Sequence, residues 1–150
     1  MTGPQQSLFA LTLVVPEYEA ALAFYVRTLG FRVLEDVDQG TKRWIRIAPP
    51  GPGNGASLVL GRATGAQQRA AVGAQSGGRV FLFLETDDFA RDHAAMLAAG
   101  VSFEEAPRHE SYGIVAVWRD PFGNRWDLLQ RHDAAAGCPG GPQTSTERLN

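Results

Sequence analysis

Apolar and polar positions in the first half of the chain follow two periods, which predict strands and a helix in a definite order. Residues 8–15 form an apolar run broken by Thr12, a pattern typical of a buried strand, and Pro16 ends it. Residues 19–29 place apolar side chains about one helical turn apart, and Gly30 follows where a helix commonly ends. Three further strands are expected, at residues 31–34, 42–47 and 56–61.

The second half repeats this order. A strand is expected over residues 79–84, and a helix capped by Asp87 or Asp88 runs to Ala99. Three strands follow, at residues 101–105, 114–118 and 125–130. Both halves therefore have the order strand, helix, strand, strand, strand, and a duplicated β-α-β-β-β unit is the simplest account.

The repeat defines the expected domain organisation. Residues 1–133 are predicted to form a single domain, with modules at about 8–61 and 79–131. The small-residue stretch 63–78 is expected to be the linker between them. Residues 134–150 lack hydrophobic periodicity and are predicted to be a disordered tail.

Composition narrows the function classes. The hydrophobic fraction of 44% and the charged fraction of 20% are those of an ordinary globular protein. A net charge of −2 gives no electrostatic basis for binding nucleic acid. The chain contains no membrane-length apolar run and no signal-peptide pattern, and Cys138 is its single cysteine. A cytoplasmic protein without nucleic-acid or membrane partners is therefore expected.

Several short motifs resemble one superfamily. They are Leu13-Val14-Val15-Pro16, Ala23-Phe24-Tyr25, Leu29-Gly30-Phe31 and Asp120-Pro121-Phe122-Gly123-Asn124. Together they are similar to the vicinal oxygen chelate superfamily, which includes glyoxalase I, bleomycin-resistance proteins, fosfomycin-resistance enzymes and extradiol dioxygenases. The resemblance implies an α+β fold in which two tandem β-α-β-β-β modules form a cup-shaped, mostly antiparallel sheet with helices outside. It also implies a divalent metal in the cup and a homodimer.

The metal-ligand positions of that superfamily map, by resemblance, onto Ala10, Val59, Arg79 and Asp127. Alanine and valine carry no donor atom, and an arginine cation repels a metal ion. Asp127 is then the one remaining ligand. We therefore expect no metal cofactor, and Asp127 is the residue to consider if a metal does bind.

Strand alternation predicts which side chains line the cup instead. If Arg79 and Asp127 point inward, so do other residues of their strands and of the first module. The predicted cup residues are Thr12, Trp44, Arg46, Arg79, Phe81, Phe83, Tyr112, Arg125 and Asp127. Arg79 could form a structural ion pair with Asp127, or it could hold an anionic ligand. A mostly apolar cup with a few polar groups is typical of a small-molecule site.

The candidates for acid–base chemistry are His109 and Glu110, which lie in a polar loop expected at the mouth of the cup. Either could act as a general base, and an ordinary solvated turn is the alternative. His93 is expected to be a surface residue of the second helix.

Two functions follow from these residues. The first is a metal-independent protein that binds a small organic ligand in the cup. The second is an enzyme of the lyase, isomerase or dioxygenase type. Such an enzyme would use either a metal at Asp127 with unusual ligands such as His109 and Glu110, or a metal-free base.

Overall fold

The computed structural model describes residues 3–132. Along the chain its elements are β1 (Ala10–Val15), α1 (Tyr18–Ala21), η1 (Leu22–Thr28), β2 (Arg32–Asp38), β3 (Arg43–Ala48), β4 (Ser57–Arg62), α2 (Gly65–Ala71), β5 (Leu82–Glu85), α3 (Phe89–Ala98), β6 (Ser102–Phe103), β7 (Arg108–Glu110), β8 (Gly113–Arg119) and β9 (Arg125–Arg131). Within this range, no helix combines the length and apolar character needed to cross a membrane.

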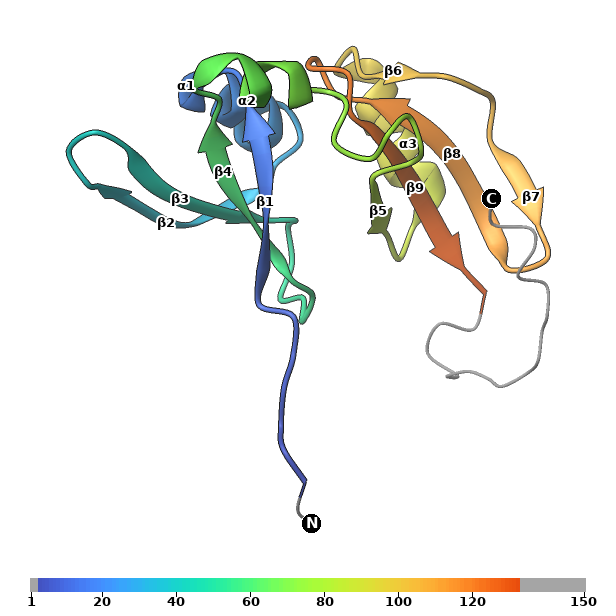
Figure 1. Ribbon diagram of the computed structural model, residues 1–150. Coiled ribbons are helices and arrows are strands. Elements are labelled where there is room, and N and C mark those ends of the chain that lie inside the picture. The colour runs from blue at the N-terminus through green and yellow to red at the C-terminus, as the bar shows by residue number, and fades with distance from the viewer. Residues whose placement is uncertain (1–2, 133–150) are drawn as a thin grey trace.

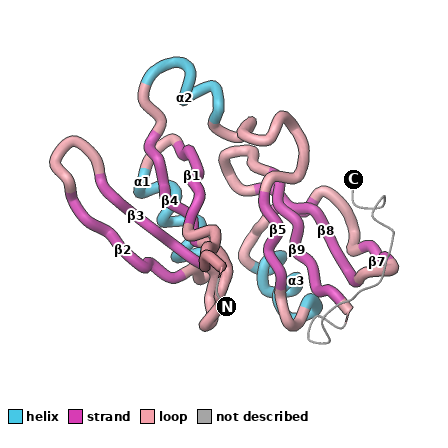
Figure 2. Tube along the Cα trace, turned by 60° about the horizontal axis from the view of Figure 1, so that its bottom comes forward, coloured by secondary structure: helices cyan, strands magenta, loops and turns pink. Residues whose placement is uncertain are grey.

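The strands form two sheets, one for each module. The first has the order β1-β4-β3-β2 and the second β5-β9-β8-β6, with β7 paired to β8. Only β1–β4 and β5–β9 are parallel pairs, so both sheets are mostly antiparallel. The expected α+β fold of two tandem β-α-β-β-β modules is confirmed. Strands β1 and β5 lie at the two sheet edges that face each other (Figures 1 and 2).

Several element boundaries differ from the prediction. The linker contains the short helix α2, and β5 begins at Leu82 rather than at residue 79. The first helix is mostly π-helical, with the Leu29 amide donating to the Phe24 carbonyl five residues earlier. Hydrophobic spacing alone does not separate α from π turns, because both bury one face. The predicted tail and Cys138 lie outside the described residues.

The alternation predicted for β1 is confirmed. Leu13 and Val15 are buried, while Thr12 and Val14, which alternate with them along the strand, are more exposed. In β9, Trp126 and Leu128 belong to the hydrophobic core. Asp127 lies between them and therefore points to the opposite face of the second sheet. Each sheet thus has one face in the core and one face away from it.

The core is shared between the modules through Tyr25 of η1. Its ring packs against Trp126 of β9, and the Trp126 indole N–H donates to the Tyr25 hydroxyl at 3.1 Å. The Tyr25 hydroxyl donates in turn to the buried carboxylate of Asp120. Burial, and then the nearby Asp120 charge, raises the pKa of Tyr25, so the hydroxyl keeps its proton and remains a donor.

Asp120 also organises the turn between β8 and β9. Its Oδ1 accepts hydrogen bonds from the backbone N–H of Phe122 at 2.9 Å and of Asn124 at 2.8 Å. Its Oδ2 accepts from the Asn124 side-chain amide at 2.7 Å. Gly123 has φ of 103°, a conformation that glycine adopts without strain. The turn is therefore held by one carboxylate that also reaches the other module.

The linker is fastened to both modules by Gln75 and Gly73. The Gln75 side-chain amide accepts from the Val14 N–H at 2.9 Å and donates to the Val14 carbonyl at 3.0 Å. It also donates to the Asn124 side-chain oxygen at 3.3 Å. A Cβ atom at Gly73 would collide with the Phe122 carbonyl oxygen, so only glycine fits this approach to the turn.

We expect Tyr25→Phe to lower the free energy of unfolding by about 1–3 kcal/mol, because it removes one buried donor to Asp120 and the acceptor for Trp126. Urea unfolding measures the loss. The matched control is Tyr18→Phe, whose hydroxyl accepts a single partly buried bond from the Arg43 N–H. Equal losses in the two variants would contradict the role given to Tyr25.

Candidate functional site

A cavity of about 430 Å³ lies in the second module, and we call it the cup cavity. Among the residues predicted for the cup, it is lined by Arg79, Phe83, Tyr112, Arg125 and Asp127. Its other lining residues are Gly78, Val80, Glu105, Arg108 and Val117. The volume is within the range of small-molecule sites, roughly 300–1,000 Å³.

Asp127 is the most unusual group in the cup cavity. It stands opposite Phe83 of β5 and Val117 of β8, and these apolar neighbours leave it 9% exposed. Its Oδ1 atom is buried and has no hydrogen-bond partner within residues 3–132. Burial raises the pKa of Asp127 to about 6, although the Arg108 charge acts in the opposite direction. The carboxyl group thus offers an unfilled hydrogen-bonding position to the cavity.

The three arginines of the cavity differ in how they are paired. Arg108 lies 3.0 Å from Glu105 and also pairs with Glu110. Arg125 holds Glu104 in a bidentate pair with both contacts at 2.9 Å. Arg79 forms no ion pair with any residue that the structure describes, Asp127 included. The structural ion pair considered between Arg79 and Asp127 is therefore not formed within residues 3–132.

Four predicted cup residues lie elsewhere. Thr12, Trp44 and Arg46 belong to the first sheet and do not line the cup cavity. Arg46 pairs with Glu35 at 2.8 Å, and the Trp44 indole N–H donates to the same carboxylate. Phe81 packs against the hydrophobic core. It precedes the first residue of β5, where regular alternation has not yet begun.

The proposed bases are not in the cavity lining. His109 lies on β7 with its side chain exposed, and Glu110 is paired with Arg108. The polar loop that was expected here is the short hairpin of β7 and β8. His93 is half-buried between Phe89 and Phe103, with ring centroids at 5.3 Å and 4.6 Å, so it packs on the sheet rather than standing free at the surface.

The donor set of the cup cavity does not suit a divalent metal. Its carboxylates are Asp127 and Glu105, and Glu105 already accepts from Arg108 and from the Val117 N–H. Three arginines share the same lining. Nowhere in residues 3–132 do three or more His, Cys, Asp or Glu side chains gather closely enough to hold a metal ion.

The sequence analysis did not predict half of the residues that line the cup cavity. For some of them, the sequence does contain a pattern that indicates their position. Val117 is the cross-strand partner of Asp127, and the tight β8–β9 turn sets this register. Arg108 is the first residue of β7, in the hairpin that β7 forms with β8. Glu105 and Gly78 lie in irregular segments, and no periodicity in the sequence marks their direction.

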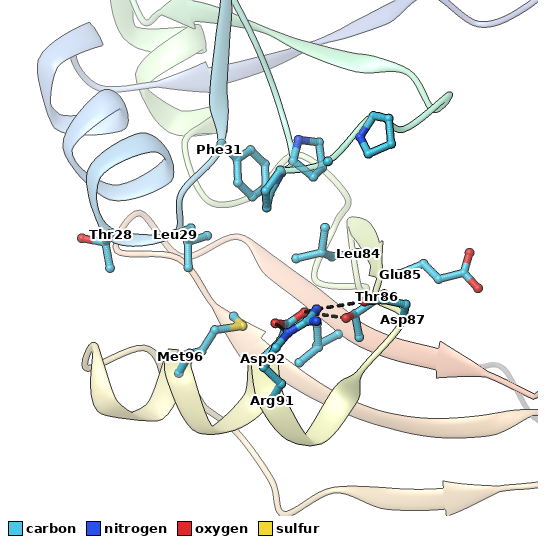
Figure 3. Close-up of a pocket in the computed structure, with 16 residues that line it drawn as sticks. Thr28, Leu29, Phe31, Leu84, Glu85, Thr86, Asp87, Arg91, Asp92 and Met96 are labelled. Carbon is cyan, nitrogen blue, oxygen red and sulfur yellow. Dashed lines mark hydrogen bonds and ion pairs between the residues drawn. The ribbon is translucent and has the colours of Figure 1, made fainter.

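A second cavity of about 530 Å³ lies between the Pro-rich loop after β3 and helix α3 (Figure 3). Four of its polar side chains, Thr86, Asp87, Arg91 and Asp92, bond to one another. Arg91 pairs with Asp87 and Asp92, both at 2.8 Å, and Thr86 donates to Asp92. No buried side-chain polar atom in this lining lacks a partner among the described residues. The cup cavity, with its unfilled Asp127, is therefore the stronger candidate site.

The sequence pattern of the Glyoxalase/Bleomycin resistance protein/Dioxygenase superfamily matches residues 7–128. The chain belongs to this superfamily, as its motifs and its tandem modules indicate.

Individual relatives agree with this membership. An uncharacterised protein of Shewanella frigidimarina (strain NCIMB 400) is 48% identical over 131 residues, covering 86% of this chain and 96% of that protein. The structure of UcmS2 has a TM-score of 0.73 and 25% identity, covering 84% of this chain and 98% of its own. TnmS3, an antibiotic binding protein from Streptomyces sp. CB03234, has a TM-score of 0.68 and 30% identity, covering 87% and 99%.

Asp127→Asn is expected to stabilise the protein near neutral pH. A carboxyl whose pKa is raised by folding favours the folded state below its unfolded pKa of about 3.9, and this contribution is lost as the pH rises through about 6. The asparagine variant avoids that loss, so it should gain up to about 3 kcal/mol at about pH 8 and under about 1 kcal/mol near pH 4.

Urea unfolding at both pH values measures this difference. The exposed Asp38, which lies outside the cup cavity, provides the control Asp38→Asn. A gain for Asp127→Asn that is the same at both pH values would contradict burial as its cause.

Proposed function

We propose that this protein binds a small planar organic molecule in the cup cavity and holds it without a divalent metal. The observation that supports this most directly is the buried Oδ1 of Asp127, which lines the cavity without a hydrogen-bond partner among the described residues. A buried polar atom left unpaired costs about 1–3 kcal/mol. A ligand that supplies a donor removes that cost.

The aromatic side chains favour a planar ligand. Phe83 is 61% exposed and stands beside Asp127 on the adjacent strand, and Tyr112 also lines the cavity. An exposed phenylalanine next to a cavity provides a flat apolar surface on which a ring can stack. Arg79, which has no carboxylate partner within residues 3–132, provides a charge for an anionic group of the same ligand.

The relatives support binding rather than a particular reaction. TnmS3 is an antibiotic binding protein, and it shares 30% identity with this chain over nearly its full length. The bases considered for an enzyme, His109 and Glu110, do not line the cavity. A binding and sequestration role therefore accounts for more of the site than a lyase or dioxygenase reaction does.

The test is fluorescence titration with the dye anilinonaphthalene sulfonate, an anion with a flat naphthalene ring. We expect Phe83→Ala to weaken dye binding about fivefold to tenfold, since a stacked ring is removed. Leu97→Ala is the matched control, because Leu97 is also an exposed apolar residue, at 50%, but lies on α3 outside the cavity. Binding that needs added zinc or manganese, or that is lost equally in the control, would overturn the proposal.

A homodimer is the assembly we expect. Leu8, Phe9, Val33 and Val37 are exposed on the first module, and β1 and β5 are sheet edges. Exposed apolar side chains and open strand edges are commonly covered by a second copy. Sedimentation at micromolar concentration should give twice the chain mass, and a monomer mass there would refute the expectation.

A further inference from the structure

Asp127 selects for one kind of chemical group. Its buried Oδ1 is an acceptor without a donor among the described residues, and the apolar side chains of Phe83 and Val117 stand on either side of it. The nearby backbone N–H of Val117 is not available to Asp127, because it donates to Glu105. The missing donor must therefore come from whatever occupies the cavity.

Arg79 selects for a different group. Arg108 and Arg125 are each held by carboxylates, which fixes their donors and neutralises their charge. Arg79 lines the same cavity with its guanidinium unpaired within residues 3–132. A free guanidinium binds carboxylates, sulfonates or phosphates through two parallel hydrogen bonds.

The number of donors decides between a cationic and a neutral donor at Asp127. Arg108 and Arg125 are neutralised by Glu105, Glu110 and Glu104, so within residues 3–132 the lining's charges without an ion-pair partner are Arg79 and Asp127. An ammonium group carries three N–H donors that lose their water on burial, and the open Oδ1 of Asp127 accepts from only one of them. A hydroxyl or amide N–H fills the Oδ1 position without burying a second charge.

We infer that the ligand is an aromatic acid with a neutral donor: a planar body with an anionic group for Arg79 and a hydroxyl or amide N–H for Asp127. This inference rests on the proposed binding function and names the class of ligand. The stack on Phe83 holds the planar body between the two polar ends. Recognition of both ends separates this class from simple hydrophobic molecules and from amines.

The experiment uses three matched probes in isothermal titration: a hydroxynaphthoate, the naphthoate without the hydroxyl, and the methyl ester of the hydroxynaphthoate. We expect the full-length protein to bind the hydroxynaphthoate about tenfold or more tightly than either analogue, as a hydrogen bond to a charged group predicts. Asp127→Leu should abolish the preference for the hydroxyl and leave the preference for the carboxylate. Arg79→Gln should do the reverse.

Two further variants serve as controls. Asp127→Asn keeps an acceptor oxygen and should keep part of the hydroxyl preference, so its comparison with Asp127→Leu isolates the loss of the hydrogen-bond acceptor. Arg69→Gln changes an exposed arginine of α2 outside the cavity and should change neither preference.

The outcomes separate the two levels of the proposal. Equal binding of all three probes by the full-length protein, with the Phe83→Ala effect retained, would overturn the ligand class while the binding function stands. Preferences that survive both Asp127→Leu and Arg79→Gln would also overturn it. Absence of binding by every probe and by the naphthalene dye would overturn both.

Discussion

The buried carboxylate of Asp120 is the interaction on which the rest of this structure depends. It gathers donors from its own turn, through Phe122 and Asn124, and from Tyr25 of the other module. A buried charge is tolerated only when its hydrogen bonds are filled. The hydrogen bonds that Asp120 accepts therefore close the turn between β8 and β9 and also join the two modules. The register of β8 against β9, and with it the position of Asp127, follows from that turn.

Asp120 and Asp127 are only seven positions apart in the printed sequence, yet they meet opposite conditions. Asp120 is buried with hydrogen bonds to both of its oxygens, and its role is structural. Asp127 is buried with Oδ1 unfilled in the described chain, and its pKa is raised to about 6. Such a group lowers stability unless something else supplies the missing bond. The contrast is between a carboxylate whose hydrogen bonds are filled by its own chain and one that leaves a hydrogen-bonding position open to the cup cavity.

Much of the fold could be predicted from the sequence, because it depends on local patterns. The alternation around Leu13 and Val15, the helix ends at Gly30 and Gly100, and the turn at Gly123 are set by side chains a few positions apart. The site was harder. Arg108 and Glu105 reach the cavity from a hairpin and an irregular segment, whose directions depend on tertiary packing. Trp44 and Arg46 lie on β3, which belongs to the first sheet. The alternation of side chains along a strand indicates which face a residue occupies, but it does not indicate how far that strand lies from the cup cavity.

The Gln75 side chain limits how many residues of β1 could pair with a strand from another molecule. Its amide occupies both the N–H and the carbonyl of Val14 on the edge that β4 leaves open. A strand from another molecule that approached this edge would find its ladder blocked at Val14 and could pair only along the residues before it. The glutamine side chain thus forms the two hydrogen bonds that a neighbouring strand would form with Val14, and it limits the length of any intermolecular β-ladder.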